Sequence, residues 1–108
     1  MDVIRERLTI NATASGWTLS GEIDAHTAPL LEEPVGTLPS GTGAVLVDIG
    51  DVSFIDSSGL RVLIGLAGRA SDEGRTLRVE HPSPAVVRLA EITGLGEMFG
   101  LTDDEPES

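Results

Sequence analysis

Residues 44–60 read AVLVDIGDVSFIDSSGL and contain the clearest change of pattern in the chain. The first six, Ala44–Ile49, form a nearly continuous apolar run, which is typical of a central strand buried on both faces. The polar motif DSSG follows at 56–59, and from Leu60 onward apolar residues recur at helical spacing. We therefore expect a central strand, a polar turn and a long helix in succession.

Upstream of this unit, the pattern predicts an antiparallel hairpin. Residues 8–14 alternate between apolar and polar side chains, Ser15-Gly16 supplies a turn, and residues 17–20 return as a second short strand.

A short helix is expected next, over residues 27–33. Pro29 lies near its first turn, where proline is favoured, and Glu32 and Glu33 are expected to face the positive end of the helix dipole. Pro34 should end or kink this helix.

Downstream, the long helix is expected to end between Ser71 and Gly74, and residues 76–80 alternate as another strand. Ser83-Pro84 then opens a third helix, which Gly94 stops. Because strands alternate with helices, we expect an α/β fold whose sheet is parallel in part.

The composition excludes several classes of protein. A chain of 108 residues with a net charge of -11 and no cysteine suits one acidic domain, without disulfides, a thiolate zinc site or a cysteine nucleophile. Its seven cations are arginines scattered among 18 acids, so we expect it to bind neither nucleic acid nor an anionic membrane.

The two ends of the chain carry separate expectations. Residues 1–7 lack the basic and then apolar order of a signal peptide, and no apolar run approaches the roughly 20 residues that span a bilayer, so we expect a cytoplasmic protein. Residues 102–108 are acidic and poor in apolar side chains, which predicts a disordered tail after a domain that spans residues 1–101.

The polar residues before the long helix have two interpretations. Asp and Ser are preferred N-cap types, so Asp56 or Ser57 is expected to cap the helix. The same position would also tolerate a phosphate on a serine, because free backbone N–H groups and the helix dipole favour an anion there. Such a phosphate adds roughly 1.5 to 2 negative charges, near Asp56 and by position near Asp24 and Asp51.

Hydrolase chemistry is a weaker interpretation of the same segment. A serine nucleophile at Ser57 would require His26 or His81 to be oriented by a carboxylate, and the G-x-S-x-G elbow is missing.

Metal, cofactor and aromatic sites are not indicated. Four aspartates could meet at one sheet edge, but their spacing matches no metal or phosphate-loop motif, so we expect solvated acids, no metal and no cofactor. These are Asp24, Asp48, Asp51 and Asp56. The aromatics Trp17, Phe54 and Phe99 are expected to pack in the core or at its rim.

Two stretches together resemble the STAS domain and, more narrowly, the anti-sigma factor antagonists. They are residues 19–24 with Thr27-Ala28, and residues 52–60. The apolar run 45–49 and residues 83–89 also match, so the resemblance covers about residues 5–100. It implies a single domain with a mixed sheet of four to five strands and helices packed mainly on one face.

The resemblance also implies a regulatory binding protein and not an enzyme. The unphosphorylated chain would bind an anti-sigma factor, itself an ATP-dependent serine kinase, and so release a sigma factor. Phosphorylation of Ser57 would end this complex until a metal-dependent serine phosphatase restores it. The residues that would bind the partner or lie beside the phosphosite are Asp24, Asp56, Ser58 and Gly59.

Two alternatives stay open at this point. The chain could be a STAS scaffold or subunit, in a stressosome or in a lipid or anion transporter. It could also be a small serine hydrolase.

Overall fold

The structure, a computed structural model, describes residues 2–4 and 7–100. Within these residues five strands form one sheet, in the order β1-β2-β3-β4-β5. The strands are β1 (Asp2–Ile4), β2 (Leu8–Ala12), β3 (Gly16–Ile23), β4 (Val45–Ile55) and β5 (Leu77–Glu80). The helices are α1 (Ala28–Glu32), α2 (Ser57–Asp72) and α3 (Pro84–Thr93), and a 3-10 turn, η1, covers Pro34–Gly36. The predicted tail, residues 102–108, lies outside the described part of the chain.

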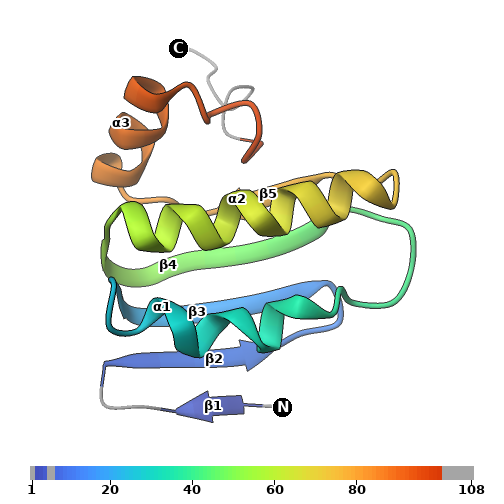
Figure 1. Cartoon of the computed structure of the whole chain (residues 1–108), viewed down its shortest axis with the longest axis horizontal. Helices are drawn as coiled ribbons and strands as arrows, with labels where there is room; N and C mark the ends of the chain where they lie inside the picture. The colour runs from blue at the N-terminus through green and yellow to red at the C-terminus, as the bar shows by residue number, and fades with distance from the viewer. Residues whose placement is uncertain (1, 5–6, 101–108) are drawn as a thin grey trace.

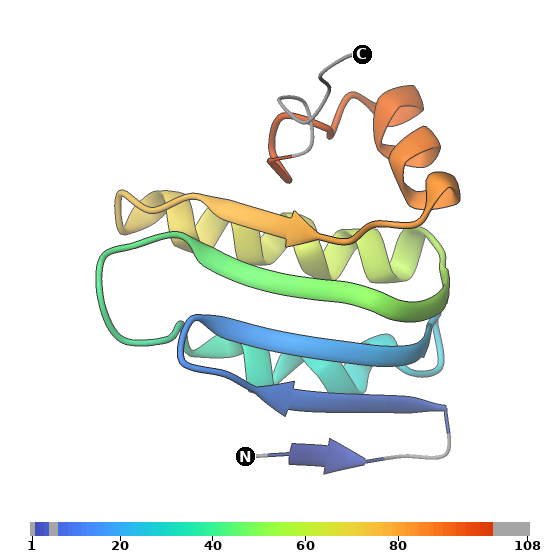
Figure 2. The same cartoon turned by 180° about the vertical axis from the view of Figure 1, so that it is seen from behind.

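The sheet is mixed, and its helices cover one face. β1, β2 and β3 pair in antiparallel fashion, whereas β4 runs parallel to both β3 and β5. The parallel connections pass through α1 and α2, which lie side by side on one face of the sheet (Figure 1). No helix crosses the opposite face, as Figure 2 shows for the described residues. The predicted α/β fold with a mixed sheet and helices mainly on one face is therefore confirmed.

The buried core fills the layer between this sheet and its two helices. In α2, the buried positions recur every three or four residues, as an amphipathic helix requires. The largest fully buried apolar side chains are Leu8, Ile10, Leu19, Ile23, Leu31, Val45, Val47, Ile49, Leu63, Leu66 and Phe99.

α3 and the turn after it lie beyond the β5 edge of the sheet in both views (Figures 1 and 2). The backbone N–H of Val79 in β5 donates to the carbonyl of Phe99 at 2.9 Å, and the Phe99 ring is completely buried. The C-terminal turn therefore pairs with the edge strand and shields it. α3 begins after its N-cap Ser83 and ends at Gly94, whose φ is 76°, as the sequence predicts.

The central strand is longer than the sequence pattern predicts. β4 continues past Ile49 to Ile55, because its pairing with β3 resumes after two register shifts. These shifts break the strict alternation, so Val52 and Ile55 are buried while Phe54 is 51% exposed. Most of the polar segment before α2 is consequently strand, and the turn itself is very short.

The acidic residues of α1 are placed contrary to expectation. The helix covers only five residues, Glu32 is its last and Glu33 follows it, so the first turn contains no acid. Both carboxylates therefore lie at the negative end of the dipole. The helix is this short because Pro34 cannot continue it, as the sequence predicts, and the chain forms η1 from Pro34 onward instead.

Arg75 anchors the long loop between η1 and β4. Its side chain is only 3% exposed, and it donates hydrogen bonds to the carbonyls of Pro39 and Gly43, each at 2.7 Å. One buried guanidinium thus fixes the chain just before the central strand begins.

Within the described ranges 2–4 and 7–100, no helix has both the length and the apolar character needed to cross a bilayer.

Candidate functional site

The candidate site lies where the parallel strands β3 and β4 end side by side. Ile23 and Ile55 are paired in register, and the N–H of Asp56 donates to the carbonyl of Ile23 at 3.1 Å. The loop that begins at Asp24 therefore lies next to the start of α2. This sheet edge brings together the two stretches that carry the family resemblance, residues 19–28 and 52–60, which are far apart in the sequence.

Asp56 caps α2, as one of the two sequence interpretations requires. Its Oδ1 accepts the backbone N–H groups of Ser58 at 2.8 Å and Gly59 at 3.3 Å. An acidic cap also interacts favourably with the positive end of the helix dipole. The cap thereby fixes the position of the first helical residue, Ser57.

The next residues of the motif differ sharply in exposure. Ser57 is exposed, Ser58 is half-buried and Gly59 is buried. The described residues offer no hydrogen-bond partner to the Ser57 hydroxyl, which is therefore accessible to another molecule. A group attached to Ser57 would meet solvent and would displace no core side chain.

Gly59 lets α2 approach the sheet closely. A Cβ atom at this position would lie 2.6 Å from Cγ1 of Ile55 and 2.7 Å from Cγ2 of Ile23. Its place in the site is therefore to seat the start of α2 on the two strand ends, which in turn positions Ser57.

Asp24 organises the neighbouring loop. Its Oδ1 accepts the backbone N–H groups of His26 at 2.9 Å and Thr27 at 3.0 Å, while its own N–H donates to Thr27 Oγ1. The Thr27 hydroxyl in turn donates to the carbonyl of Glu22 at 2.8 Å. These bonds lock the turn between β3 and α1 next to Ser57.

The Asp24 carboxylate is held in its charged form. The hydrogen bond from the backbone of Thr27, and then those from His26 and from the Arg7 guanidinium, lower the pKa of Asp24 below its ordinary value and outweigh the effect of desolvation. Arg7 also donates to Glu22 Oε1 through Nε at 2.9 Å and through Nη2 at 2.6 Å.

Arg7 is a site residue that the sequence does not indicate, because no local pattern connects it to acids so much later in the chain. Only the pairing of β2 with β3 brings the residue before β2 to the end of β3. The signal that could have found it is the predicted hairpin itself, whose open end must place these residues together.

The other acidic candidates do not join the site. Asp48 and Asp51 lie within β4, well before its end, whereas Asp24 and Asp56 follow the strand ends. The suggested convergence of all four is therefore wrong, because β4 extends further than its apolar run. In the described part of the chain no cluster of three or more His, Asp or Glu side chains could hold a metal ion.

The histidines give little support to a catalytic triad. His81 Nδ1 lies 3.1 Å from Asp48 Oδ1, so its carboxylate partner belongs to the middle of β4. From there to Ser57 is on the order of 20 Å at the usual rise of a strand. His26 lies in the Asp24 loop, where its backbone donates to Asp24 and no carboxylate among the described residues pairs with its ring.

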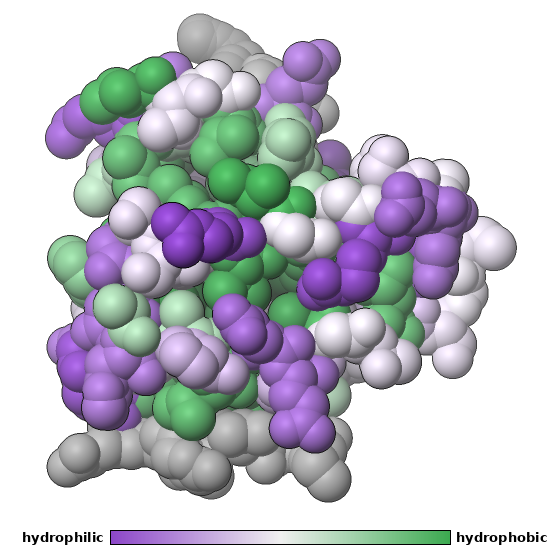
Figure 3. All heavy atoms as spheres, in the orientation of Figure 1, coloured by the Kyte–Doolittle hydropathy of each residue, from purple (hydrophilic) through white to green (hydrophobic). Residues whose placement is uncertain are grey.

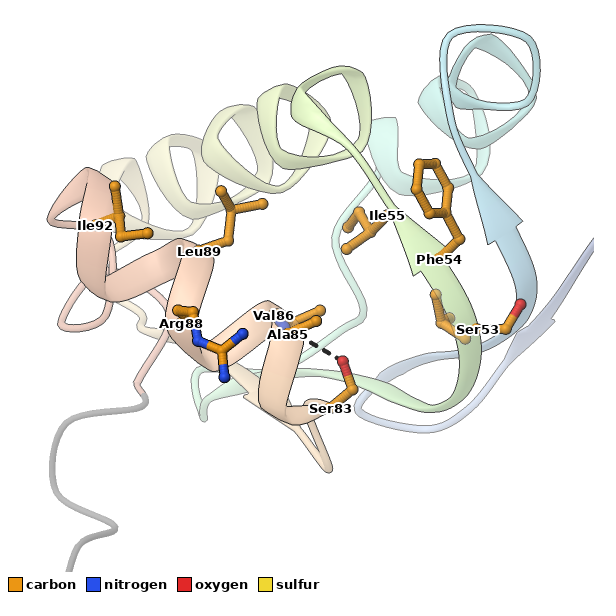
Figure 4. A pocket seen from close by; sticks show the side chains of 10 residues that line it. Ser53, Phe54, Ile55, Ser83, Ala85, Val86, Arg88, Leu89 and Ile92 are labelled. Carbon is orange, nitrogen blue, oxygen red and sulfur yellow. Dashed lines mark hydrogen bonds between the residues drawn. The ribbon is translucent and has the colours of Figure 1, made fainter.

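A second feature near the site is apolar. Figure 3 shows apolar side chains gathered between α2 and α3, and a hollow of about 280 Å³ separates the end of β4 from α3 (Figure 4). Phe54 and Ile55 line it from β4, and Leu89 and Ile92 from α3. Among the described residues that line it, Arg88 alone is charged, and these residues form no acid–base pair. Phe54 thus packs at a rim, whereas Trp17 and Phe99 are buried in the core.

Comparison with known proteins places the chain in a family. The family model described as Mlab, STAS domain, matches residues 7–102. The anti-sigma-B factor antagonist of Bacillus subtilis is 33% identical over 84 residues, which cover 78% of this chain and 77% of the relative.

Solved structures agree with the fold described above. The crystal structure of an anti-sigma factor antagonist from Mycobacterium paratuberculosis has a TM-score of 0.62 at 25% identity, covering 92% of this chain and 81% of that one. The Bacillus cell fate determinant SpoIIAA, in its phosphorylated form, has a TM-score of 0.58 at 20% identity, covering 84% and 86%, and shows a shared fold. The chain therefore belongs to the STAS domain family and, within it, to the anti-sigma factor antagonists.

Proposed function

We propose that this chain binds an anti-sigma factor through the sheet edge formed by the Asp24 loop and the start of α2, and that phosphorylation of Ser57 switches this binding off. The observation that carries the proposal is the exposure of Ser57 at the first position of α2. Its neighbours Asp24, Asp56, Ser58 and Gly59 shape the surface around it, each through the contacts given above.

The partner that we propose is itself a serine kinase. Ser57 Oγ attacks the γ-phosphate of ATP, the bond to the β-phosphate oxygen breaks, ADP leaves, and the hydroxyl proton passes to a base on the kinase. A metal-dependent phosphatase then hydrolyses the phosphate ester with water and restores the serine. In this scheme the chain is a substrate of both partners and a binding protein, not a catalyst.

The location of Ser57 explains why one phosphate suffices. The modification adds roughly 1.5 to 2 negative charges where Asp24 and Asp56 already lie. Because the core is untouched, the fold remains and only the surface changes. A partner surface that fits closely or is acidic loses affinity through repulsion and bulk. The solved phosphorylated form of SpoIIAA, which shares this fold, supports the idea that the fold tolerates a phosphate.

The proposal is tested by calorimetric titration of the anti-sigma factor kinase from the same cells with variants at Ser57. Ser57→Ala should bind like the unmodified chain and stay bound in the presence of ATP, because it lacks the acceptor hydroxyl. Ser57→Asp should bind at least about tenfold more weakly, which corresponds to about 1.4 kcal/mol. Ser71→Asp adds the same charge at the far, exposed end of α2 and should leave affinity unchanged. Equal affinities for all three variants would remove Ser57 from the mechanism.

The alternative role as a STAS subunit of a transporter or stressosome uses the same fold. The matching family model is described as Mlab, STAS domain, so this alternative is tested as well. Affinity purification of the tagged chain from its own cells separates the two: a kinase of the anti-sigma type supports the proposed switch, whereas a membrane ATPase or permease supports the subunit role.

A further inference from the structure

Arg61 lies one helical turn after Ser57 on α2, and both residues are exposed. Residues four apart on a helix are neighbours, with Cβ atoms about 5 to 6 Å apart. Helical side chains also tilt toward the N-terminus, so that of Arg61 leans over the turn that contains Ser57. The helix thus brings a guanidinium within reach of any group attached to the Ser57 hydroxyl.

Two of the carboxylates near Ser57 are already engaged. The Asp56 carboxylate accepts two backbone N–H groups of α2, and Asp24 is bound by its own loop and by Arg7. Glu32 of α1 lines, together with Arg61, a hollow of about 230 Å³ between the two helices. Among residues 2–4 and 7–100, however, no carboxylate forms a salt bridge with Arg61.

We propose that Arg61 pairs with the phosphate of phosphoserine at position 57. The inference rests on the proposed function, because that function puts the phosphate there. An anion that precedes a cation by four residues is the favourable order on a helix, and guanidinium binds phosphate through two parallel hydrogen bonds. Phosphorylation would then withdraw Arg61 from the surface that the unmodified chain offers to its partner.

This pairing predicts a shift in the second ionisation of the phosphate. A neighbouring cation favours the dianion over the monoanion, so it lowers the pKa of that step. Four acids act against the effect of Arg61 on this pKa: Asp56 at the preceding position, Asp24 and Glu22 across the sheet edge, and Glu32 on α1. Arg7 and His26 lie on the same side of the site as Asp24. Removing Arg61 alone therefore isolates its contribution.

The test uses the full chain with phosphoserine placed at position 57 during synthesis, so no kinase is needed. Phosphorus NMR titration gives the phosphate pKa in the phosphorylated chain, in its Arg61→Gln variant and in an Arg88→Gln control, which removes an exposed arginine from α3. We expect Arg61→Gln to raise that pKa by roughly 0.3 unit or more, and Arg88→Gln to leave it unchanged. Equal values in all three proteins would overturn the pairing.

A second measurement needs no substitution at Arg61. In nitrogen-15 spectra of the arginine side chains, the Arg61 Nε–H signal should move when phosphoserine replaces Ser57, whereas that of Arg88 should stay. An unmoved Arg61 signal would also overturn the inference.

The two proposals fail in different ways. If the chain with phosphoserine at 57 binds the anti-sigma factor as tightly as the unmodified chain, the proposed switch is wrong, even where the pKa shift is found. If binding is switched but the phosphate pKa is indifferent to Arg61, the pairing alone is wrong.

Discussion

Replacing Gly59 by alanine should destabilise the protein, although alanine is the better helix former. The added Cβ would lie 2.6 Å from Ile55 Cγ1, 2.7 Å from Ile23 Cγ2 and 3.0 Å from Ile55 Cδ1. Both isoleucines are at least nine-tenths buried at the strand ends, so they cannot swing into solvent. Something in the packing between α2 and the sheet must move.

The size of the effect follows from two opposing contributions. Overpacking a closely packed core costs typically 1–3 kcal/mol. Glycine to alanine inside a helix gains up to about 1 kcal/mol from propensity. At Gly68, on the same helix, an added methyl group would have no described atom within 4 Å apart from its chain neighbours and the nearby backbone of the helix, so Gly68→Ala should show the gain in propensity without the cost of overpacking. The difference between the two variants should therefore be about 1–3 kcal/mol.

Urea unfolding of both variants at 25 °C measures this difference directly. With a slope of about 1–3 kcal/mol per molar urea, the midpoint of Gly59→Ala should lie roughly 1 M below that of Gly68→Ala. The reasoning would be refuted if Gly59→Ala stabilised the protein as much as Gly68→Ala does, since the start of α2 would then have room for a methyl group.

Two further predictions concern the other fixed points of the fold. Arg75→Met should lower the melting temperature by roughly 10 °C. The carbonyls of Pro39 and Gly43 would lose their donors, and each unpaired group costs about 1–3 kcal/mol. An unchanged melting temperature in calorimetry would contradict this account of the loop. The pKa of Asp24 lies below its ordinary value of 3.8 in the folded chain, so the stability that its charge provides is complete above that value and is lost as the pH falls through the lower, folded-state pKa. The free energy of unfolding should consequently fall less steeply from pH 5 to pH 2 in Asp24→Asn than in the unmodified chain. Identical slopes would show that the charge of Asp24 does not stabilise the fold.

Much of the site could be predicted from the sequence, because its signals are local. A cap acts on the first turn of its own helix, so the motif at 56–59 was enough to place the start of α2, whereas the exposure of Ser57 comes from the structure. The partners of Asp24 within its own loop are equally local. Arg7 could not be found in this way, since its contact with Asp24 depends on how β2 pairs with β3.

β4 shows the same division within a single strand. Its apolar first half is typical of a buried strand, whereas its polar second half is typical of a turn. Only pairing with β3 extends it to Ile55, and the register shifts in that pairing expose Phe54. β1 also had no clear pattern of its own and is defined by its pairing with β2.

The sequence by itself therefore determined the identity and order of the helices and of most strands, because periodicity, prolines and caps act over one turn or one strand. Only the tertiary structure decided which charges meet at the sheet edge, how far β4 extends, and how closely Gly59 seats α2 on the isoleucines beneath it. These features depend on strand register and on packing between segments distant in the chain, which no local pattern of residues specifies.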